Sequence, residues 1–321
     1  MNRLFISVFG LLAALLVLPA LPAHAAQPLM TPAELAARLG DARLRIVDIR
    51  SGNFAKSANG IEHIAGAQSA PYPQWRGPKD SPGKMPTSAA LTTLIQRLGI
   101  DESTPVVVVY EGTDSTDFGS AARVYWTLKA AGVPALSVLN GGMVAWRAAG
   151  LPLVAGSAES TAQTPSKFQV HLDQRLIASR DEVAQAVRTG SATLLDTRPS
   201  AFFTGEARHP AAKAPGTIVG AKNVSHEVWF TQAALLPPAD IKRVAQQFAV
   251  QTDQPVISFC NTGHWAATNW FVLSELLGHA NVKLYPESVV DWSNAGLAMD
   301  NVPNRLQQFW LQLKLASGGA P

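Results

Sequence analysis

The chain has 321 residues, of which 47% are hydrophobic and only 15% charged, and 26 Lys+Arg against 23 Asp+Glu give a formal net charge of +3. This length allows about two domains, and the composition excludes a disordered or polyelectrolyte chain. The small, dispersed positive charge gives no reason to expect nucleic-acid binding. The chain contains one cysteine, Cys260, so neither an internal disulfide nor a cysteine-rich zinc site can form.

The first 26 residues have the layout of a secretory signal peptide. Arg3 supplies a positive start, residues 4–18 form an apolar run, and Ala23, His24 and Ala25 offer small residues around a cleavage site. We therefore expect a signal peptide over residues 1–26 and export of the mature chain to a periplasm, where it has no membrane span. A retained membrane anchor is the alternative interpretation.

The remainder of the chain repeats one pattern twice. Residues 44–50 and 193–198 are apolar runs that end in Asp-x-Arg, and residues 105–110 and 255–259 are apolar runs that begin with Pro. A Gly-Ala pair lies between the two runs of each half, and a short apolar run followed by Trp comes after them. This internal similarity predicts two copies of one domain.

Short β-branched strands alternate with amphipathic stretches, which predicts an α/β fold of parallel strands with helices on both sides. The expected helical stretches are residues 32–39, 88–98, 121–131, 180–188, 239–248 and 266–277. We place the domains at residues 27–154 and 167–301, with a linker at 155–166 that is rich in Ala, Ser and Thr and a tail at 302–321.

Cys260 directly follows the strand 255–259. The next residues are Asn261, Thr262, Gly263, His264 and Trp265, and a helix comes after them. The thiol thus lies at the edge where open α/β sheets bind ligands, and free N–H groups and the helix dipole there favour thiolate over thiol. Gly263 allows the positive φ that a cradle of N–H groups requires. A buried structural cysteine is the alternative.

The duplicated domain, the Asp-x-Arg strand ends, the Gly-Ala segments and the six-residue loop that opens with Cys260 resemble the two-domain rhodanese-type sulfurtransferases. The resemblance covers residues 28–301. It implies two tandem doubly wound α/β domains with parallel sheets, of which the first lacks the catalytic cysteine. We place Glu111 at the position of Cys260. We interpret residues 111–117, which carry three carboxylates, as a longer, solvated loop in a scaffold domain that closes the cleft.

The resemblance also implies a mechanism. Cys260 attacks the sulfane sulfur of a small sulfur-containing anion such as thiosulfate and passes it, as a persulfide, to cyanide or a thiol. Neither a metal nor an organic cofactor is expected, and a periplasmic protein is a further candidate acceptor. The main alternative is a non-turnover sulfur carrier or binding module that delivers persulfide to a partner protein. A cysteine phosphatase is disfavoured, because Ala266 and Ala267 stand where its loop would end in Arg.

The sequence departs from the family pattern beside the cysteine. Asn261 and Thr262 stand where members that use thiosulfate often have Arg or Lys. The Gly-Ser-Gly-Val-Thr run of members that use mercaptopyruvate is missing, and Phe202 replaces a further basic residue. Other groups must then meet the charge of the donor. The candidate substrate-binding residues are Asn261, Thr262, Gly263, His264, Trp265, Arg198, Arg76 and His226. The alternative role of Arg198 is an ion pair with a buried carboxylate, and the alternative role of His264 is to cap the following helix.

Overall fold

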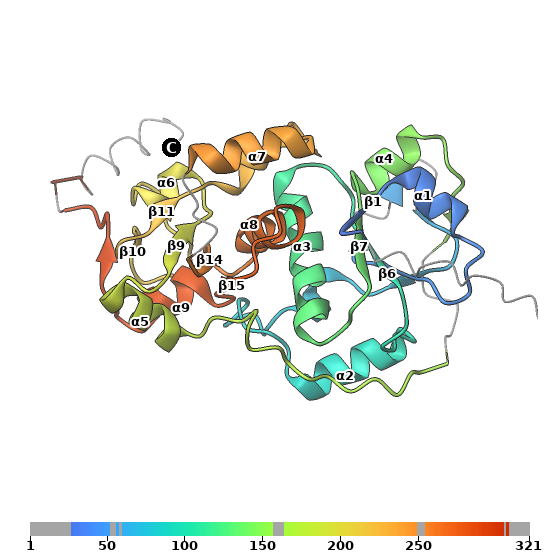
Figure 1. Cartoon of the computed structure of the whole chain (residues 1–321), viewed down its shortest axis with the longest axis horizontal. Coiled ribbons are helices and arrows are strands. Elements are labelled where there is room, and N and C mark those ends of the chain that lie inside the picture. The colour runs from blue at the N-terminus through green and yellow to red at the C-terminus, as the bar shows by residue number, and fades with distance from the viewer. Residues whose placement is uncertain are drawn as a thin grey trace, which may run out of the picture.

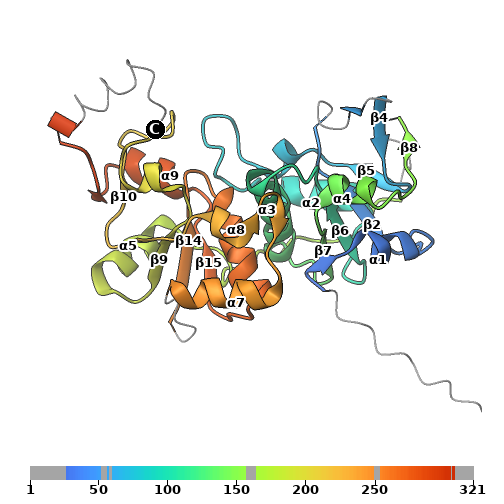
Figure 2. The same ribbon diagram turned by 90° about the horizontal axis from the view of Figure 1, so that it is seen from above.

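The computed structural model describes residues 27–51, 56–57, 60–156, 164–248, 254–304 and 306–307. The predicted signal peptide lies outside these ranges, as do most of the predicted linker and most of the predicted tail. Within them, no helix has the length and apolar character needed to cross a membrane. Figures 1 and 2 show two α/β lobes side by side, the first in blue to green and the second in yellow to red.

The first lobe is built on a parallel sheet. In spatial order its strands are β1 (Leu29–Met30), β7 (Leu136–Leu139), β6 (Val106–Val109), β2 (Arg45–Asp48) and β5 (Ala67–Ser69). Its helices are α1 (Pro32–Ala37), the 3-10 helix η1 (Tyr72–Trp75), α2 (Ser88–Arg97), α3 (Ser115–Ala130) and α4 (Gly142–Ala148). The four valines of β6 are all buried and alternate between two hydrophobic clusters, so the strand is covered on both faces.

The second lobe repeats this plan. Its parallel sheet has the order β11 (Lys222–Asn223), β9 (Thr193–Asp196), β14 (Val256–Phe259) and β15 (Val282–Leu284). Its helices are α5 (Arg180–Thr189), α6 (Ser200–Phe203), η2 (His226–Trp229), α7 (Pro238–Gln247), α8 (Trp265–Phe271), the π-helical turn η3 (Val272–Leu276) and α9 (Ser288–Asn294). The predicted fold of two α/β lobes, each with a parallel sheet and flanking helices, is therefore confirmed.

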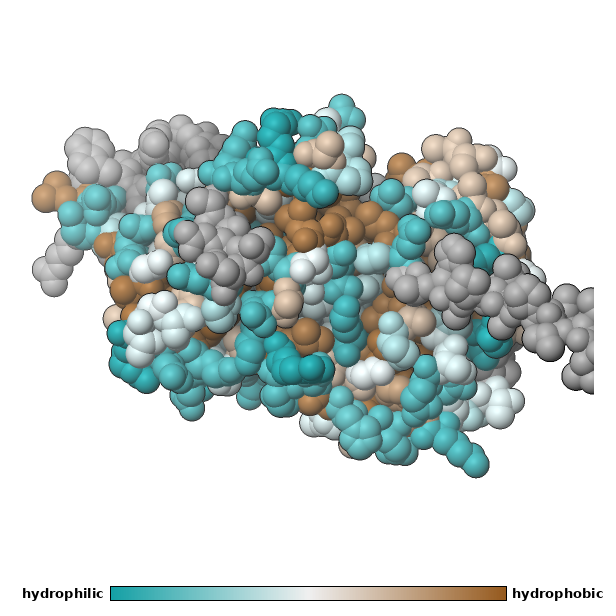
Figure 3. All heavy atoms as spheres, viewed as in Figure 1, coloured by the Kyte–Doolittle hydropathy of each residue, from teal (hydrophilic) through white to brown (hydrophobic). Residues whose placement is uncertain are grey.

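Short strand pairs lie outside the two main sheets. They are β3 (Lys56–Ser57) with β4 (Gly60–His63) and β8 (Val154–Ala155), β10 (Thr217–Ile218) with β16 (Met299–Asp300), and β12 (Phe230–Thr231) with β13 (Ala234–Leu235). On the face shown in Figure 3, hydrophilic side chains predominate and apolar residues form separate patches.

The lobes meet through the equivalent helices α3 and α8, which pack against each other between the two sheets (Figure 1). One hydrophobic cluster continues from the first lobe into the second, and the ring of Phe271 lies edge-on to Phe118 and Tyr125, with centroids 5.6 and 5.0 Å apart. Burial of a shared apolar core is the main force that joins two domains. Cys260 belongs to this same cluster, so the thiol lies on the side of the second sheet that faces the first lobe.

α3 begins at Ser115, six residues earlier than predicted. The side chain of Asp114 accepts a hydrogen bond from the backbone N–H of Asp117 at 2.8 Å and caps the helix. The predicted helix 266–277 is also changed, because α8 ends at Phe271 and continues as the π-helical turn η3. Both differences lie at the lobe interface, where packing decides helix boundaries.

Candidate active site

Cys260 is anchored by the turn between β15 and α9. Its N–H donates to Ser288 Oγ at 3.1 Å, and that hydroxyl donates to the carbonyl of Tyr285 at 2.7 Å. The carbonyl of Cys260 accepts from the N–H of Val289 at 3.0 Å. Ser288 has a φ of +57°, a conformation that is unfavourable for a side chain with a Cβ and that recurs at functional sites. The backbone around the thiol is therefore fixed on both sides, and Cys260 is only 1% exposed.

The loop after Cys260 offers a series of free donors. In the described part of the chain, the backbone N–H groups of residues 261–265 donate no hydrogen bond to a protein acceptor. Gly263 has a φ of +70° and turns the chain within this loop. Successive N–H groups in such a turn form a concave site for an anion. The arrangement suits the oxygens of an anionic donor or a terminal sulfur on Cys260.

Arg198 braces the loop. It forms a double hydrogen bond with Asp196, with Nε–Oδ1 at 2.9 Å and Nη2–Oδ2 at 2.5 Å, and both residues are almost completely buried. Its Nη1 donates to Asn261 Oδ1 at 3.2 Å, and Nη2 also donates to the carbonyl of Gly216. The charge of Arg198 is thus matched by Asp196, which is the alternative considered for it, and Arg198 also holds the side chain of Asn261.

The first lobe reaches the loop through η1. Arg76 Nη2 donates to Thr262 Oγ1 at 3.0 Å, and Arg76 Nη1 donates to the hydroxyl of Tyr72 at 2.9 Å. The Tyr72 hydroxyl lies 2.7 Å from His264 Nδ1, and His264 Nε2 lies 2.8 Å from the carbonyl oxygen of Thr116. Since a carbonyl can only accept, Nε2 carries the proton and Nδ1 accepts from Tyr72.

His264 was expected as a source of positive charge or as a helix cap, and it is neither. Burial, reinforced by repulsion from Arg76, lowers its pKa to about 3, so the ring is neutral at physiological pH. It occupies the position before the first residue of α8, but its side chain makes no capping hydrogen bond. Its ring instead joins the loop to Tyr72 and Thr116 of the first lobe.

An aromatic wall stands beside the loop. The rings of Trp265 and His226 are stacked, with centroids 4.9 Å apart, and Phe202 contacts Trp265 edge-on at 5.9 Å. Trp265 Nε1 donates to Thr116 Oγ1 at 3.1 Å. His226 is buried, which lowers its pKa, and its Nδ1 lies 3.2 Å from the carbonyl of Thr197. His226 therefore supplies no positive charge near neutral pH either.

The prediction that Glu111 occupies the place of Cys260 is wrong by one residue. The last residues of β6 and β14 both lie opposite the Asp of the Asp-x-Arg pair, so the strand registers match each other. The next residue is Tyr110 in the first lobe and Cys260 in the second. Glu111 corresponds to Asn261, and its carboxylate accepts a hydrogen bond from Arg50, as Asn261 accepts one from Arg198.

The greater length predicted for the first-lobe loop is also wrong. α3 and α8 begin equally far beyond Tyr110 and Cys260, so the two loops have the same length. Asp117 belongs to α3, and its Oδ2 accepts from the backbone N–H of Gly112 at 2.6 Å and of Thr113 at 3.1 Å. A protein carboxylate thus occupies the N–H groups of this loop.

Sequence reasoning missed four residues of the site: Tyr72, Thr116, Arg123 and Ser288. Arg123 could have been noticed in the sequence, because it is the one charged residue in the apolar stretch 121–128 of a predicted helix. Its Nη1 donates to the carbonyl of Gly263 at 3.0 Å. The others have no such signal, since their roles depend on contacts between the lobes or on one unusual backbone angle.

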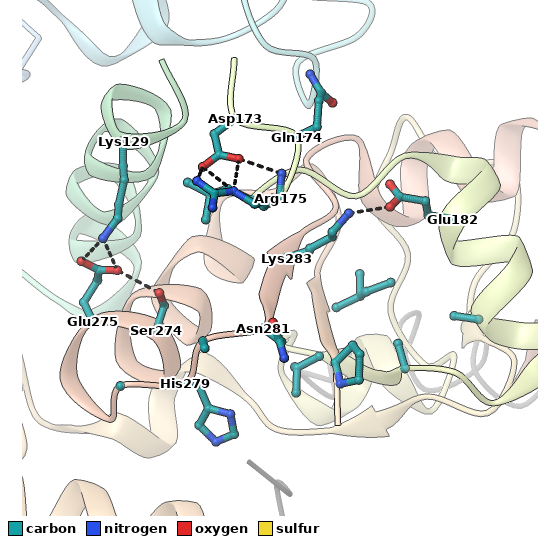
Figure 4. Close-up of a pocket in the computed structure, with 18 of the residues that line it drawn as sticks. Lys129, Asp173, Gln174, Arg175, Glu182, Ser274, Glu275, His279, Asn281 and Lys283 are labelled. Atoms are coloured by element: carbon teal, nitrogen blue, oxygen red, sulfur yellow. Dashed lines mark hydrogen bonds and ion pairs between the residues drawn. The ribbon is translucent and has the colours of Figure 1, made fainter. Parts of the chain in front are cut away.

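The groove in Figure 4 lies elsewhere, at the amino-terminal end of β14. None of the predicted site residues lines it. Its charged side chains are paired, as the figure shows for Lys129 with Glu275 and for Lys283 with Glu182. This groove contributes nothing to the surroundings of Cys260.

Comparison with known proteins agrees with this geometry. The family model described as a rhodanese-like domain matches residues 31–149 and 179–295. Thiosulfate sulfurtransferase of Azotobacter vinelandii is 31% identical over 82% of this chain and 93% of its own. Thiosulfate/3-mercaptopyruvate sulfurtransferase 2 of Arabidopsis thaliana is 29% identical over 85% of this chain and 86% of its own.

Among solved structures, that of SseA from Escherichia coli, described as one of the 3-mercaptopyruvate sulfotransferases, covers 82% of this chain and 98% of its own with a TM-score of 0.69. At 24% identity this likeness supports the fold. The predicted sulfurtransferase class is confirmed by the relatives that span most of the chain. The family model matches both lobes, and the chain belongs to the rhodanese family, with two rhodanese-like domains.

Proposed function

We propose that the protein transfers a sulfane sulfur through a persulfide on Cys260. One observation carries this proposal: the single cysteine directly follows β14, and the next five backbone N–H groups have no acceptor among the described residues. A thiolate is the nucleophile in such chemistry, and N–H groups beside it stabilise both the thiolate and a terminal sulfur. The equivalent Tyr110 of the first lobe offers no nucleophile of this kind.

The reaction has two balanced steps. The Cys260 thiolate attacks the outer sulfur of thiosulfate, the S–S bond of the donor breaks, and sulfite leaves with the bonding electrons. Cyanide or a thiolate then attacks the outer sulfur of the persulfide, and the cysteine thiolate leaves and is regenerated. One transfer is thereby divided into two steps through a covalent intermediate.

The donor that we propose is a small sulfur-containing anion, with thiosulfate as the first choice. Arg76 is the cation that supports this choice, because its guanidinium reaches Thr262 of the loop while Arg198 is neutralised by Asp196. Since Cys260 is 1% exposed, the donor reaches it only after side chains around the loop move. Thr116 lies against His264 and Trp265 and is a candidate for that movement.

Steady-state kinetics test the proposal. With thiosulfate and cyanide varied together, double-reciprocal plots should give parallel lines, many thiocyanates should form per chain, and Cys260→Ser should form none. A single thiocyanate per chain with no further turnover would instead identify a sulfur carrier. Intersecting lines would contradict the two-step scheme.

Export to a periplasm is a separate proposal, supported by the signal-peptide pattern of residues 1–26. The test is the amino-terminal sequence of the protein recovered from cell fractions. A chain that starts near residue 27 in the periplasmic fraction is expected. A full-length chain in the cytosol would contradict export.

A further inference from the structure

Arg123 is a fully buried cation without a carboxylate partner. Its side chain extends from α3 of the first lobe and is 0% exposed. The guanidinium donates to the carbonyls of Gly263 at 3.0 Å and Gly83 at 2.9 Å, while Nε has no hydrogen-bond partner. Within the described ranges Arg123 forms no ion pair. A buried charge without a counter-charge is strongly unfavourable, so this arrangement calls for an anion nearby.

The other two buried arginines among the described residues are neutralised. Arg50 forms an ion pair with Asp48, and Arg198 forms one with Asp196. Arg123 lacks this protection, although it lies over the face of Trp126 at 5.0 Å. An aromatic face offsets only a small part of the cost of burying a cation. Arg123 thus differs from the structural arginines of the same fold.

The candidate anion is the sulfur of Cys260, because Cys260 opens the loop whose Gly263 carbonyl accepts from Arg123 at 3.0 Å. Burial and repulsion from Arg76 lower the pKa of Arg123 to about 9, and the Cys260 thiolate acts in the opposite direction. Arg123 therefore stays charged at neutral pH. The ionisable groups that face Arg123 and the Cys260 loop are Tyr72 on η1, Arg76 directly after η1, and His264 in the loop.

Of these groups, Tyr72 and His264 are neutral at pH 7. Burial raises the pKa of Tyr72 above its ordinary value, and the pKa of His264 is about 3. The carboxylate of Glu287 also raises the pKa of Arg123, by less than the Cys260 thiolate does. Besides Arg198, which Asp196 neutralises, the described cations that donate to the loop after Cys260 are Arg76 and Arg123, and both come from the first lobe.

We propose that Arg123, supplied by the lobe that has no cysteine, is the positioning residue that holds the Cys260 loop and provides the counter-charge for its thiolate and persulfide. The proposal rests on the persulfide function above. The thiolate and the persulfide anion each carry one negative charge, so one buried cation matches both stages of the cycle. By binding the carbonyl of Gly263, Arg123 also keeps a partial negative charge away from the sulfur.

The test compares two neutralising variants on the same helix. Arg123→Gln keeps a donor for one carbonyl but removes the charge. Lys129→Met breaks another contact between the lobes, the ion pair with Glu275 at 2.7 Å, away from the loop. Thiolate absorbance in the ultraviolet is followed against pH, with the signal of Cys260→Ser subtracted, and thermal unfolding shows that each variant is folded.

Arg123→Gln is expected to move the midpoint of thiolate absorbance to higher pH by about one unit and to slow persulfide formation at neutral pH about tenfold. Lys129→Met is expected to leave the midpoint unchanged. A folded Arg123→Gln protein with the midpoint of the wild type would overturn the proposal. If wild type forms no persulfide while Arg123→Gln still shifts the midpoint, the proposed function fails and the counter-charge stands.

Arg123→Lys provides a second variant, in case the glutamine protein does not fold. Lysine keeps the charge but lacks the rigid planar fork with which the guanidinium holds two carbonyls. Its midpoint should stay within about half a pH unit of wild type, while persulfide formation slows because the loop is held less firmly. A raised midpoint in this charge-preserving variant would contradict the proposal.

Discussion

Tyr110 and Cys260 occupy the same place in the two lobes. Each carbonyl accepts a hydrogen bond from the first turn of a later helix: Met143 N–H donates to Tyr110 at 2.9 Å and Val289 N–H donates to Cys260 at 3.0 Å. The backbone of the two sites is therefore alike, and their chemistry differs through side chains. In the first lobe the loop N–H groups of Gly112 and Thr113 are already occupied by the carboxylate of Asp117.

This relationship predicts that a cysteine alone does not restore a site in the first lobe. In a Cys260→Ser background, Tyr110→Cys should gain no sulfur from thiosulfate, because Asp117 occupies the donors of Gly112 and Thr113 and repels an anion. Intact-protein mass measures the gain. If this double variant did gain one sulfur, the carboxylate would not be what blocks the site.

Strand pattern and repeat made the fold predictable. β7 (Leu136–Leu139) lies where its apolar run placed it, and the all-valine β6 alternates between two cores as a parallel strand should. The position of Cys260 after β14 followed from the same pattern. Glu111 was misplaced because counting from the Asp-x-Arg pair assumes equal spacing in both halves, whereas register is set by hydrogen bonds across the sheet.

The site was less predictable because it is assembled from both lobes. Arg76 was named from the sequence, but its partners Tyr72 and Thr262 are brought together only by packing of the lobes. The neutral state of His264 could not be predicted from the sequence either, since it depends on burial of the ring against the first lobe. Interactions between segments that are distant in the chain leave no periodic signal in a single sequence.

Gly263→Ala should abolish most sulfur transfer. A Cβ at this position would overlap the guanidinium of Arg123 and the carbonyl of Pro286, and the φ of +70° disfavours any side chain. The loop must shift, so persulfide formation should slow at least about tenfold, since a small displacement of a reacting group has a large effect on rate. Stopped-flow measurement of sulfite release checks this.

Gly190→Ala is the matched control. Gly190 also has a positive φ, +66°, at the carboxyl end of α5, but nothing lies within 4 Å of the added Cβ. It should lose about 1 kcal/mol of unfolding free energy and keep its rate of sulfur transfer. Equal losses of rate in both variants would mean that the backbone angle, and not the contact with Arg123, matters.

Asp196→Asn should destabilise the second lobe. The substitution leaves the guanidinium of Arg198 buried without its partner, which costs about 3–5 kcal/mol of unfolding free energy. Denaturant titration measures this loss. Asp173→Asn, which removes the partner of the exposed Arg175, should change the unfolding free energy little. Similar losses for both variants would contradict the role given to the buried pair.

His264 should make the protein less stable in mild acid. Its pKa is about 3 in the folded protein and 6.5 in the unfolded chain, so the unfolded state binds more protons between these values. The unfolding free energy therefore falls as the pH drops below 6.5, by about 2 kcal/mol from this residue at pH 5. His264→Gln removes that part of the dependence, while His209, His226 and His279, whose pKa values are also lowered, remain in both proteins.

Denaturant titrations of wild type and His264→Gln between pH 5 and 7.5 provide the comparison, over a range set by the ordinary histidine pKa of about 6.5. The two curves of unfolding free energy against pH should approach each other as the pH falls, because only wild type loses the contribution of this ring. Parallel curves would mean that the ring is not held neutral by the first lobe.

The central claim is that Cys260 carries the transferred sulfur, and intact-protein mass tests it most directly. Wild type incubated with thiosulfate should gain about 32 Da, one sulfur atom, and lose it on addition of cyanide, while Cys260→Ser should gain nothing. A gain on both proteins would place the sulfur elsewhere. No gain on wild type with thiosulfate, mercaptopyruvate or polysulfide would contradict the persulfide mechanism.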